Sequence, residues 1–205
     1  MSTTRETDAI YQVYISDQNA EPPQLLQRAI ASVQQCFSAY RYVRHNGDSL
    51  RAFIEQNFDR EVVAAYDKLR PYSYKADLGR YCLLYQNGGW YADISIIMRS
   101  HVAAISSDVD LIYFFDLGDG VVPGRSLFDV STSLLYARPR QAALDAAIPT
   151  VLGAAIASQP RSQRHVSGHL MPLTPNHRQR NLSFVLPDGS ILAIFKKCSH
   201  EGCQV

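Results

Sequence analysis

Apolar positions recur along the chain with two periods, one typical of strands and one typical of helices. Alternating apolar and polar residues predict strands, whereas apolar residues at three- and four-residue spacing predict helices. The predicted strands are Ile10–Ile15, Tyr40–His45, Trp90–Met98 with an interruption at Asp93, Leu111–Phe115, Ser133–Ala137, Leu182–Leu186 and Ser190–Phe195. The predicted helices are Gln24–Cys36, Ser49–Phe58, Glu61–Leu69, Tyr74–Gln86 and Arg140–Ala157. Because strands and helices alternate, we expect an α/β fold with a mainly parallel central sheet flanked by helices.

Turn residues mark the ends of several of these elements. Asp48 is expected to cap the helix that begins at Ser49. The run Asn87-Gly88-Gly89 follows the helix Tyr74–Gln86 and supplies residues that can take a positive φ. Pro187-Asp188-Gly189 joins the last two strands into a predicted hairpin.

Composition and charge exclude several classes of protein. Hydrophobic residues make up 46% of the 205 positions and charged residues 19%, so we expect one folded domain over residues 1–205 rather than a disordered chain. Twenty basic and nineteen acidic residues leave a net charge of +1, less than a nucleic-acid-binding face normally needs. We find no apolar run of the roughly 20 residues that span a bilayer, and the polar Met1–Ala9 segment is not a signal or transit peptide. We expect a cytoplasmic protein, free or docked at a membrane, with a secreted effector as the alternative.

The four cysteines are too few for a disulfide scaffold in a chain of this length. Cys198 and Cys203 flank His200, and these residue types bind zinc in other proteins. The pair has no second cluster near it in the sequence, so we expect reduced thiols. A zinc-binding interaction domain built on these three residues is a minor alternative.

The residues that carry chemistry concentrate between Tyr74 and Ser95. Asp77 and Arg80 stand three positions apart on one face of a predicted helix, and Asp93 interrupts the following strand. Each has an ordinary structural interpretation, as a surface ion pair or as a turn residue. Together with the double glycine between them, they favour a ligand site at the end of the strand, where open α/β sheets bind ligands.

The order and spacing of these residues match a known signature. The matching positions are Ala76-Asp77, Arg80-Tyr81, Leu84-Tyr85, Gly88-Gly89, Tyr91 and Asp93. They resemble the DXD-containing glycosyltransferase sugar-binding superfamily, which includes fungal outer-chain mannosyltransferases, capsular polysaccharide transferases and clostridial glucosylating toxins. The resemblance is best over Ile10–Ile15 and Asp48–Met98. It implies a GT-A-type, Rossmann-like nucleotide-sugar-binding domain and a retaining glycosyltransferase. The implied reaction moves a hexose, from a UDP-hexose above all, to a glycan, a lipid-linked sugar or a protein.

The resemblance also implies roles for individual residues. Tyr14 takes the place of the aromatic residue that stacks on the nucleotide base. Asp77 and Arg80 match the pair that holds the donor-sugar hydroxyls and the phosphate side, and Tyr91 matches an aromatic residue lining the same pocket. Asp93 matches the first acid of the DXD motif, which touches the ribose and the metal shell.

A divalent cation, Mn²⁺ or Mg²⁺, is the cofactor that the resemblance implies, because it neutralises the leaving diphosphate through oxygen ligands. The second acid of the motif is Ser95 in this chain, and a neutral hydroxyl binds such an ion less well than a carboxylate. Three outcomes follow: weaker metal affinity, a metal held by other residues such as His200, or a nucleotide-sugar-binding module without catalysis. His200 lies in a weak match to the family's C-terminal metal-binding segment, and a polar tail is the alternative interpretation.

Other residues have two open interpretations. Thr132 and Ser133 fall near family positions beside the donor, but packing at the start of a strand explains them equally well. His169 falls where relatives often have Gly-Pro before a helix, and a structural histidine is favoured over a site role. The carboxylates available for a double displacement are Asp116, Asp119 and Asp129. The resemblance favours a front-face route, in which the leaving phosphate takes the acceptor proton and no protein nucleophile is needed.

Overall fold

Strands and helices follow one another in the alternating order that the sequence predicts. The structure is a computed structural model that describes residues 9–117, 128–157, 180–185 and 191–196. The strands are β1 (Ala9–Val13), β2 (Arg41–His45), β3 (Gly89–Ala92), β4 (Ile96–Met98), β5 (Leu111–Leu117), β6 (Phe128–Ala137), β7 (Arg180–Val185) and β8 (Ile191–Lys196). The helices are α1 (Gln24–Cys36), α2 (Gly47–Asn57), α3 (Arg60–Lys68), α4 (Tyr72–Asn87) and α5 (Ala142–Ala157), with a short 3-10 helix η1 (Asp17–Asn19).

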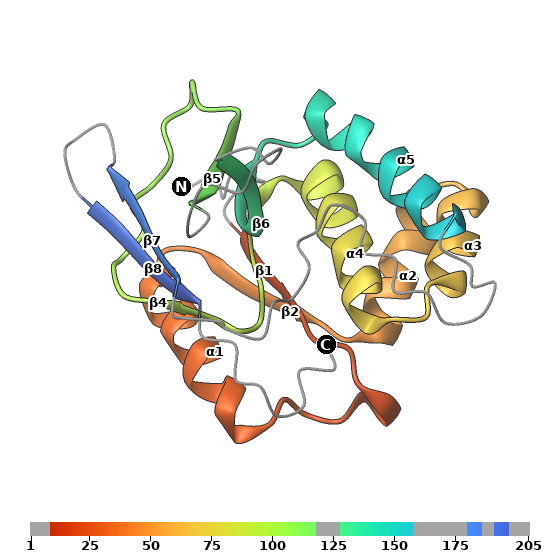
Figure 1. Cartoon of the computed structure of the whole chain (residues 1–205), viewed down its shortest axis with the longest axis horizontal. Helices are drawn as coiled ribbons and strands as arrows, with labels where there is room; N and C mark the ends of the chain where they lie inside the picture. The colour runs from red at the N-terminus through yellow and green to blue at the C-terminus, as the bar shows by residue number, and fades with distance from the viewer. Residues whose placement is uncertain (1–8, 118–127, 158–179, 186–190, 197–205) are drawn as a thin grey trace, which may run out of the picture.

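The central sheet has five strands in the order β2-β1-β3-β6-β5 (Figure 1). β1 pairs in parallel with β2 on one side and with β3 on the other. β6 runs antiparallel to β3, and β5 runs antiparallel to β6, so β5 points the same way as β3. The prediction of a mainly parallel sheet is therefore confirmed, with β6 as the strand that runs against the others.

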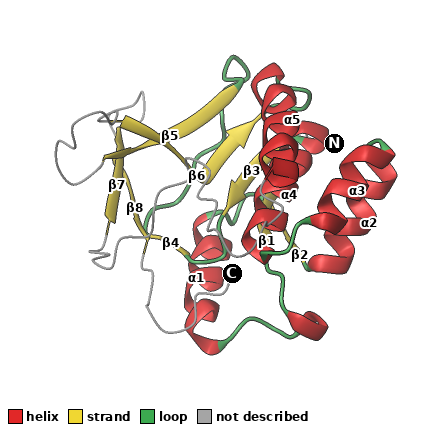
Figure 2. Cartoon of the chain, turned by 45° about the vertical axis from the view of Figure 1, so that its right-hand side comes forward, coloured by secondary structure: helices red, strands yellow, loops and turns green. Residues whose placement is uncertain are grey.

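Helices cover both faces of this sheet (Figures 1 and 2). Tyr11 and Val13 of β1 pack into a core shared with α2, α3, α4 and α5. Ile10 of the same strand packs into a second core, where α1 and β4 contribute. The alternation of side chains along β1 thus supplies one buried face to each layer. Within the residues that the structure describes, every helix is too short or too polar to cross a membrane.

The predicted strand Trp90–Met98 is in fact two strands in two different sheets. β3 belongs to the central sheet, and β4 pairs with β8 in a three-stranded sheet of order β4-β8-β7. A turn at Asp93 separates them, because the Ile96 amide donates to the Asp93 carbonyl at 3.0 Å. The expected interruption is therefore confirmed, but its effect is a change of sheet. The expected terminal hairpin is also confirmed, since β7 and β8 pair antiparallel.

The helix α2 begins earlier than predicted, and its cap is not Asp48. Asn46 caps it: the Asn46 side chain accepts from the Ser49 amide at 2.8 Å, while the Ser49 hydroxyl accepts from the Asn46 amide at 3.0 Å. Asp48 lies in the first turn and accepts instead from the Asn19 side chain at 2.5 Å. The prediction of Asp48 as the cap is wrong, because the reciprocal Asn46–Ser49 pair satisfies the first amides of the helix.

The double glycine after α4 adopts the predicted left-handed conformation, with φ of 66° at Gly88 and 95° at Gly89. A Cβ atom at Gly88 would lie 2.5 Å from the Pro139 side chain, so the turn also requires the missing side chain. The chain passes from α4 straight into β3, and Trp90, expected in the core, is 2% exposed. This short connection sets the helix that carries Asp77 beside β3, the strand that Asp93 directly follows.

Two of the four cysteines lie in the described residues, and both are buried and free. Burial raises the pKa of the Cys82 thiol to about 12, so it stays protonated at neutral pH. The expectation of reduced thiols is confirmed for Cys36 and Cys82. Cys198, His200 and Cys203, which the zinc alternative needs, lie outside the described residues.

Candidate active site

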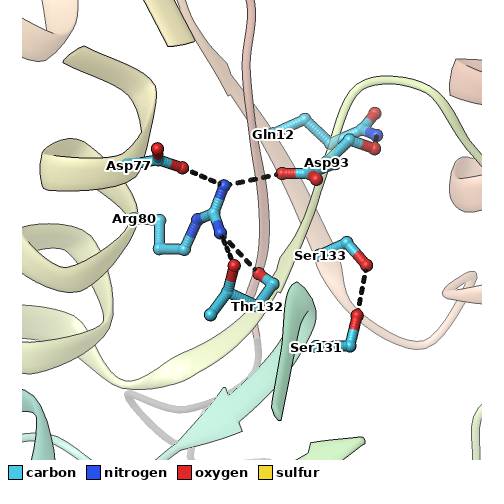
Figure 3. A network of polar contacts seen from close by, with 7 residues as sticks. All are labelled: Gln12, Asp77, Arg80, Asp93, Ser131, Thr132 and Ser133. Atoms are coloured by element: carbon cyan, nitrogen blue, oxygen red, sulfur yellow. Dashed lines mark hydrogen bonds and ion pairs between the residues drawn. The ribbon is translucent and has the colours of Figure 1, made fainter. Parts of the chain in front are cut away.

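One arginine joins the end of β3 to the helix α4. The Nη2 atom of Arg80 lies 2.7 Å from Oδ1 of Asp77 and 2.9 Å from Oδ1 of Asp93 (Figure 3). The Arg80 side chain is 5% exposed, whereas those of Asp77 and Asp93 are 20% and 21% exposed. The helix and the sheet edge therefore converge, and both carboxylates keep a surface that solvent or a ligand can reach.

The strand β6 supplies the third side of this cluster. The Nη1 atom of Arg80 donates to the Thr132 carbonyl at 2.8 Å and also to the Thr132 hydroxyl (Figure 3). Below the guanidinium, the Tyr91 ring lies 4.9 Å from its central carbon, a cation–π distance. The contacts of Arg80 thus come from α4, from β6 and from β3 with the turn after it. Together they hold the plane of the guanidinium in one orientation.

The charges of the cluster are set by burial and by the two acids. Burial alone would lower the pKa of Arg80, but the charges of Asp93 and Asp77 outweigh it and the pKa is raised. Arg80 is therefore a permanent cation. Two carboxylates beside one guanidinium leave a local charge of about −1 if both are ionised, which favours a bound cation or the hydroxyl groups of a sugar over a free anion.

The main chain of Asp93 is fixed as firmly as its side chain. Its amide donates to the Ser133 carbonyl at 2.8 Å, and its carbonyl accepts from the Ile96 amide. The Gln12 side chain, which is 0% exposed, donates to the same carbonyl at 3.1 Å. Gln12 lies in the predicted strand Ile10–Ile15, which resembles the first strand of the glycosyltransferase family, but the sequence pattern assigns it no role.

The remaining predicted site residues lie in different surroundings. Tyr14 follows β1 and is half-buried, and its amide donates to the His45 carbonyl at 2.9 Å. Ser95 is half-buried in the turn after Asp93. Tyr91 is 1% exposed beneath Arg80, and this burial raises the pKa of its hydroxyl. Its expected role as an aromatic residue lining the donor pocket stays a prediction.

Of the other candidate residues, some lie outside the described part of the chain and some contact protein groups. His200, His169 and Asp119 lie outside the described residues. Asp116 and Asp129 are opposite each other in the β5–β6 ladder. The hydroxyl and the carbonyl of Thr132, a residue near a family position beside the donor sugar, both accept hydrogen bonds from Arg80. Ser133 is 4% exposed, and its hydroxyl lies 2.8 Å from that of Ser131.

A polar pocket of about 370 Å³ lies at the end of β1. It is lined by Ile15, Ser16, Asp17, Gln18, Asn19, Gly47, Asp48, Arg51, Tyr66, Tyr72 and Lys75. Lys75 stands two positions before Asp77, but the three cluster residues do not line this pocket. Gln18 and Asn19 take left-handed φ of 56° and 52°, a strained conformation that is enriched at functional sites. The sequence pattern does not indicate this pocket, because its lining residues come from segments far apart in the chain.

The geometry shows which of the described residues could bind a divalent cation. In the described part of the chain, no three His, Cys, Asp or Glu side chains gather closely enough to hold a metal ion. Asp93 offers one carboxylate whose Oδ1 atom already bonds Arg80, and Ser95 offers a hydroxyl two positions later. Magnesium is commonly held by one or two carboxylates together with substrate phosphates. Within the described residues, Asp93 and Ser95 would need further oxygen ligands, such as substrate phosphates, to hold a cation.

Comparisons with known proteins point to the same segment. Residues 23–111 match the family described as the glycosyltransferase sugar-binding region containing DXD motif. A stretch of 57 residues is 37% identical to an uncharacterized glycosyltransferase of Acanthamoeba polyphaga mimivirus, covering 28% of this chain and 23% of that protein. The solved PaToxG glycosyltransferase shares 11% identity and a TM-score of 0.52, over 75% of this chain and 63% of that one. A transferase mutant with two cysteine-to-serine substitutions follows at 9% identity and a TM-score of 0.49, over 74% and 80% of the two chains.

The two kinds of comparison support different statements. The structural likeness, at 11% identity, concerns the fold and agrees with a GT-A-type architecture. The sequence match covers the segment that holds α4, β3 and the turn at Asp93, so it includes all three residues of the cluster. Residues 23–111, with Asp77, Arg80 and Asp93 among them, are therefore similar to the DXD-containing glycosyltransferase family, and the fold is of GT-A type.

Proposed function

We propose that this protein is a retaining glycosyltransferase that moves a hexose from a nucleotide sugar, UDP-hexose in the first place, to a hydroxyl acceptor. The observation that carries the proposal is the cluster in which Arg80 holds Asp77 and Asp93 side by side at the end of β3. Carboxylates fixed in this way can accept hydrogen bonds from sugar or ribose hydroxyls. A site that pairs such hydroxyls discriminates strongly against ligands that lack them.

The polar pocket at the end of β1 supports a place for the nucleoside part of the donor. Its volume of about 370 Å³ falls in the range of small-molecule sites. Lys75 lies on the wall nearest in sequence to Asp77, and its ammonium group could meet a phosphate. Tyr14 directly precedes Ile15 and Ser16 of the wall, and its proposed role is to stack on the base.

A divalent cation, Mn²⁺ or Mg²⁺, would be held by Asp93 and Ser95 together with the diphosphate oxygens, with His200 as a further proposed ligand. The cation supplies charge neutralisation for the departing diphosphate. Arg80 keeps the Asp93 carboxylate in its orientation through the bond to Oδ1. Asp77 and Asp93 are both engaged by Arg80, which agrees with the front-face route without a protein nucleophile.

Replacing Ser95 with aspartate should tighten the cation site. We expect Ser95→Asp to lower the Mn²⁺ concentration at half-saturation, in the presence of UDP, by about tenfold, because a carboxylate replaces a neutral hydroxyl as ligand. Isothermal titration of Mn²⁺ into the UDP-loaded protein measures this. The control is Ser95→Asn, which has the size of aspartate without its charge and should leave the Mn²⁺ affinity near that of the wild type. Equal affinities in all three proteins would place the cation elsewhere.

Titration with UDP tests the proposed function itself. We expect the wild-type protein to bind UDP, more tightly with Mn²⁺ than with EDTA, and to release free sugar or transfer it from a radiolabelled donor. GDP in the same titration tests the choice of base. If neither nucleotide binds in either condition, the glycosyltransferase proposal fails.

Ser95 favours one alternative function, a nucleotide-sugar-binding module without catalysis. This module would bind UDP as the enzyme does but would show no turnover of the donor at any Mn²⁺ concentration. The turnover assay therefore separates the two functions, whereas the binding assay does not. The proposed acceptors are a glycan, a lipid-linked sugar or a protein side chain, and we propose a cytoplasmic location, with docking at a membrane surface as one form of it.

A further inference from the structure

Gln12 is a polar side chain in the middle of the sheet that is completely buried. It is 0% exposed, and it shares its face of β1 with Ile10, which packs into the apolar core under α1. Its Nε2 atom donates to the Asp93 carbonyl at 3.1 Å, and its Oε1 atom accepts from the Tyr42 hydroxyl at 3.0 Å. Because a carbonyl oxygen can only accept, the amide can have only this orientation.

The position of Gln12 coincides with the place where the ladder between β1 and β3 ends. The two strands pair at Ile10 with Trp90 and at Tyr11 with Tyr91, and the pairing stops there. Asp93 lies beyond this point, so β1 offers its carbonyl no main-chain partner. On the other side, the Asp93 amide still donates to the Ser133 carbonyl of β6. On the β1 side, the Gln12 side chain therefore supplies a hydrogen bond to the Asp93 carbonyl where the ladder provides none.

Packing alone does not explain an amide at this position. An apolar side chain would fill the same space without the free energy that is lost when an amide leaves water. Among the described residues, two hydrogen bonds compensate the amide, and one of them goes to Asp93. The other goes to Tyr42 of β2, whose burial raises the pKa of its hydroxyl, so that the group stays a donor at neutral pH.

We infer that Gln12 is a positioning residue for the DXD turn: from the face of the sheet opposite Arg80, it fixes the Asp93 carbonyl and thereby the direction in which the Asp93 carboxylate leaves the strand. Arg80 orients the carboxylate from the α4 side, and Gln12 orients the peptide that carries it. The role rests on the proposed function, because a fixed carboxylate matters only if it meets the donor.

The variant that tests this is Gln12→Met, which keeps the length and unbranched shape of the side chain and removes both hydrogen bonds. We expect hydrogen exchange at the amides of Asp93 and Ile96 to become about tenfold faster, because the turn opens more easily. The matched control is Ser32→Ala. Ser32 accepts from the Met98 amide at 2.9 Å, so its loss also removes a side-chain bond to the main chain near β4, but without contact to Asp93. In this control only the exchange near Met98 should change.

Binding of UDP separates a positioning role from a purely structural one. We expect Gln12→Met to weaken UDP binding about tenfold and Ser32→Ala to leave it unchanged, at a similar loss of thermal stability. In a double-mutant cycle with Asp93→Ala, the Gln12→Met change should have no further effect on UDP affinity, because Gln12 acts through Asp93.

The outcomes are distinguishable from those of the proposed function. If the wild-type protein binds no nucleotide, the proposed function fails, and the exchange rates still decide whether Gln12 holds the turn. Unchanged exchange at Asp93 and Ile96 in Gln12→Met overturns the inference in either case. Faster exchange with wild-type UDP affinity, or additive effects in the cycle, would make Gln12 a structural residue only and also overturn it.

Discussion

Replacing Asp93 with alanine should lower the turnover of a nucleotide-sugar donor by on the order of 100-fold or more, while the protein stays folded. The carboxylate stands at the end of β3 with about a fifth of its side chain exposed, where it can meet ribose hydroxyls and a cation on the diphosphate. Loss of one preorganised group that stabilises transition-state charge typically reduces turnover by 10² to 10³. A radiolabelled donor, with free and transferred sugar counted together, measures the effect.

The structure explains why this variant should fold. Arg80 keeps Asp77 and Thr132 as partners, and loss of its charged hydrogen bond to Asp93 costs about 1.5–3 kcal/mol in the free energy of unfolding. Asp110→Ala is the control, since this carboxylate pairs with Arg138 at 3.3 Å on the surface before β5. It should leave turnover unchanged. Turnover at the wild-type rate in Asp93→Ala would remove Asp93 from the site.

Replacing Arg80 with methionine should have the largest effect on stability. The guanidinium is 5% exposed, and its removal leaves two carboxylates facing each other and the Thr132 carbonyl without its donor. Breaking a buried ion pair by removing one partner costs about 3–5 kcal/mol, and the partial exposure of the two acids favours the lower end. Urea denaturation, followed by the midpoint and slope of unfolding, gives the free energy.

A second arginine of the chain provides the matched comparison. Arg51 also contacts two carboxylates, Asp67 at 2.8 Å and Glu55 at 3.1 Å, but its side chain is 41% exposed. Solvent screens this pair, so Arg51→Met should lower stability far less than Arg80→Met. Equal losses in the two variants would show that burial of the cluster around Arg80 does not contribute to stability.

Local patterns in the sequence were sufficient for the elements and for the core of the site. The apolar spacing of Gln24–Cys36 gave the helix α1 with the bounds that the structure has. The three-residue spacing of Asp77 and Arg80 placed them on one helix face, and their bond of 2.7 Å follows from it. The double glycine predicted a tight turn, and a tight turn brings β3 back beside α4.

Long-range contacts were beyond such patterns. The capping of α2 depended on whether Asn46 or Asp48 faced the first amides, and the fold chose Asn46. Thr132 lies 52 positions from Arg80, and Gln12 lies 81 positions from Asp93, so neither hydrogen bond leaves a periodic trace. The guanidinium of Arg80 covers the ring of Tyr91 in the core, and the sequence pattern does not indicate this contact.

By itself, the sequence determined the alternating α/β order, the place of the double-glycine turn and the family that the segment around Asp77, Arg80 and Asp93 resembles. Only the tertiary structure decided that a single buried guanidinium bonds both acids, that β6 holds it from a third side, and that Gln12 secures Asp93 from beneath the sheet. Periodicity reports which face of an element is buried, because burial repeats with the geometry of the helix or strand. The partner of a polar group is fixed only when distant strands and helices pack together, and this packing creates the contacts at the end of β3.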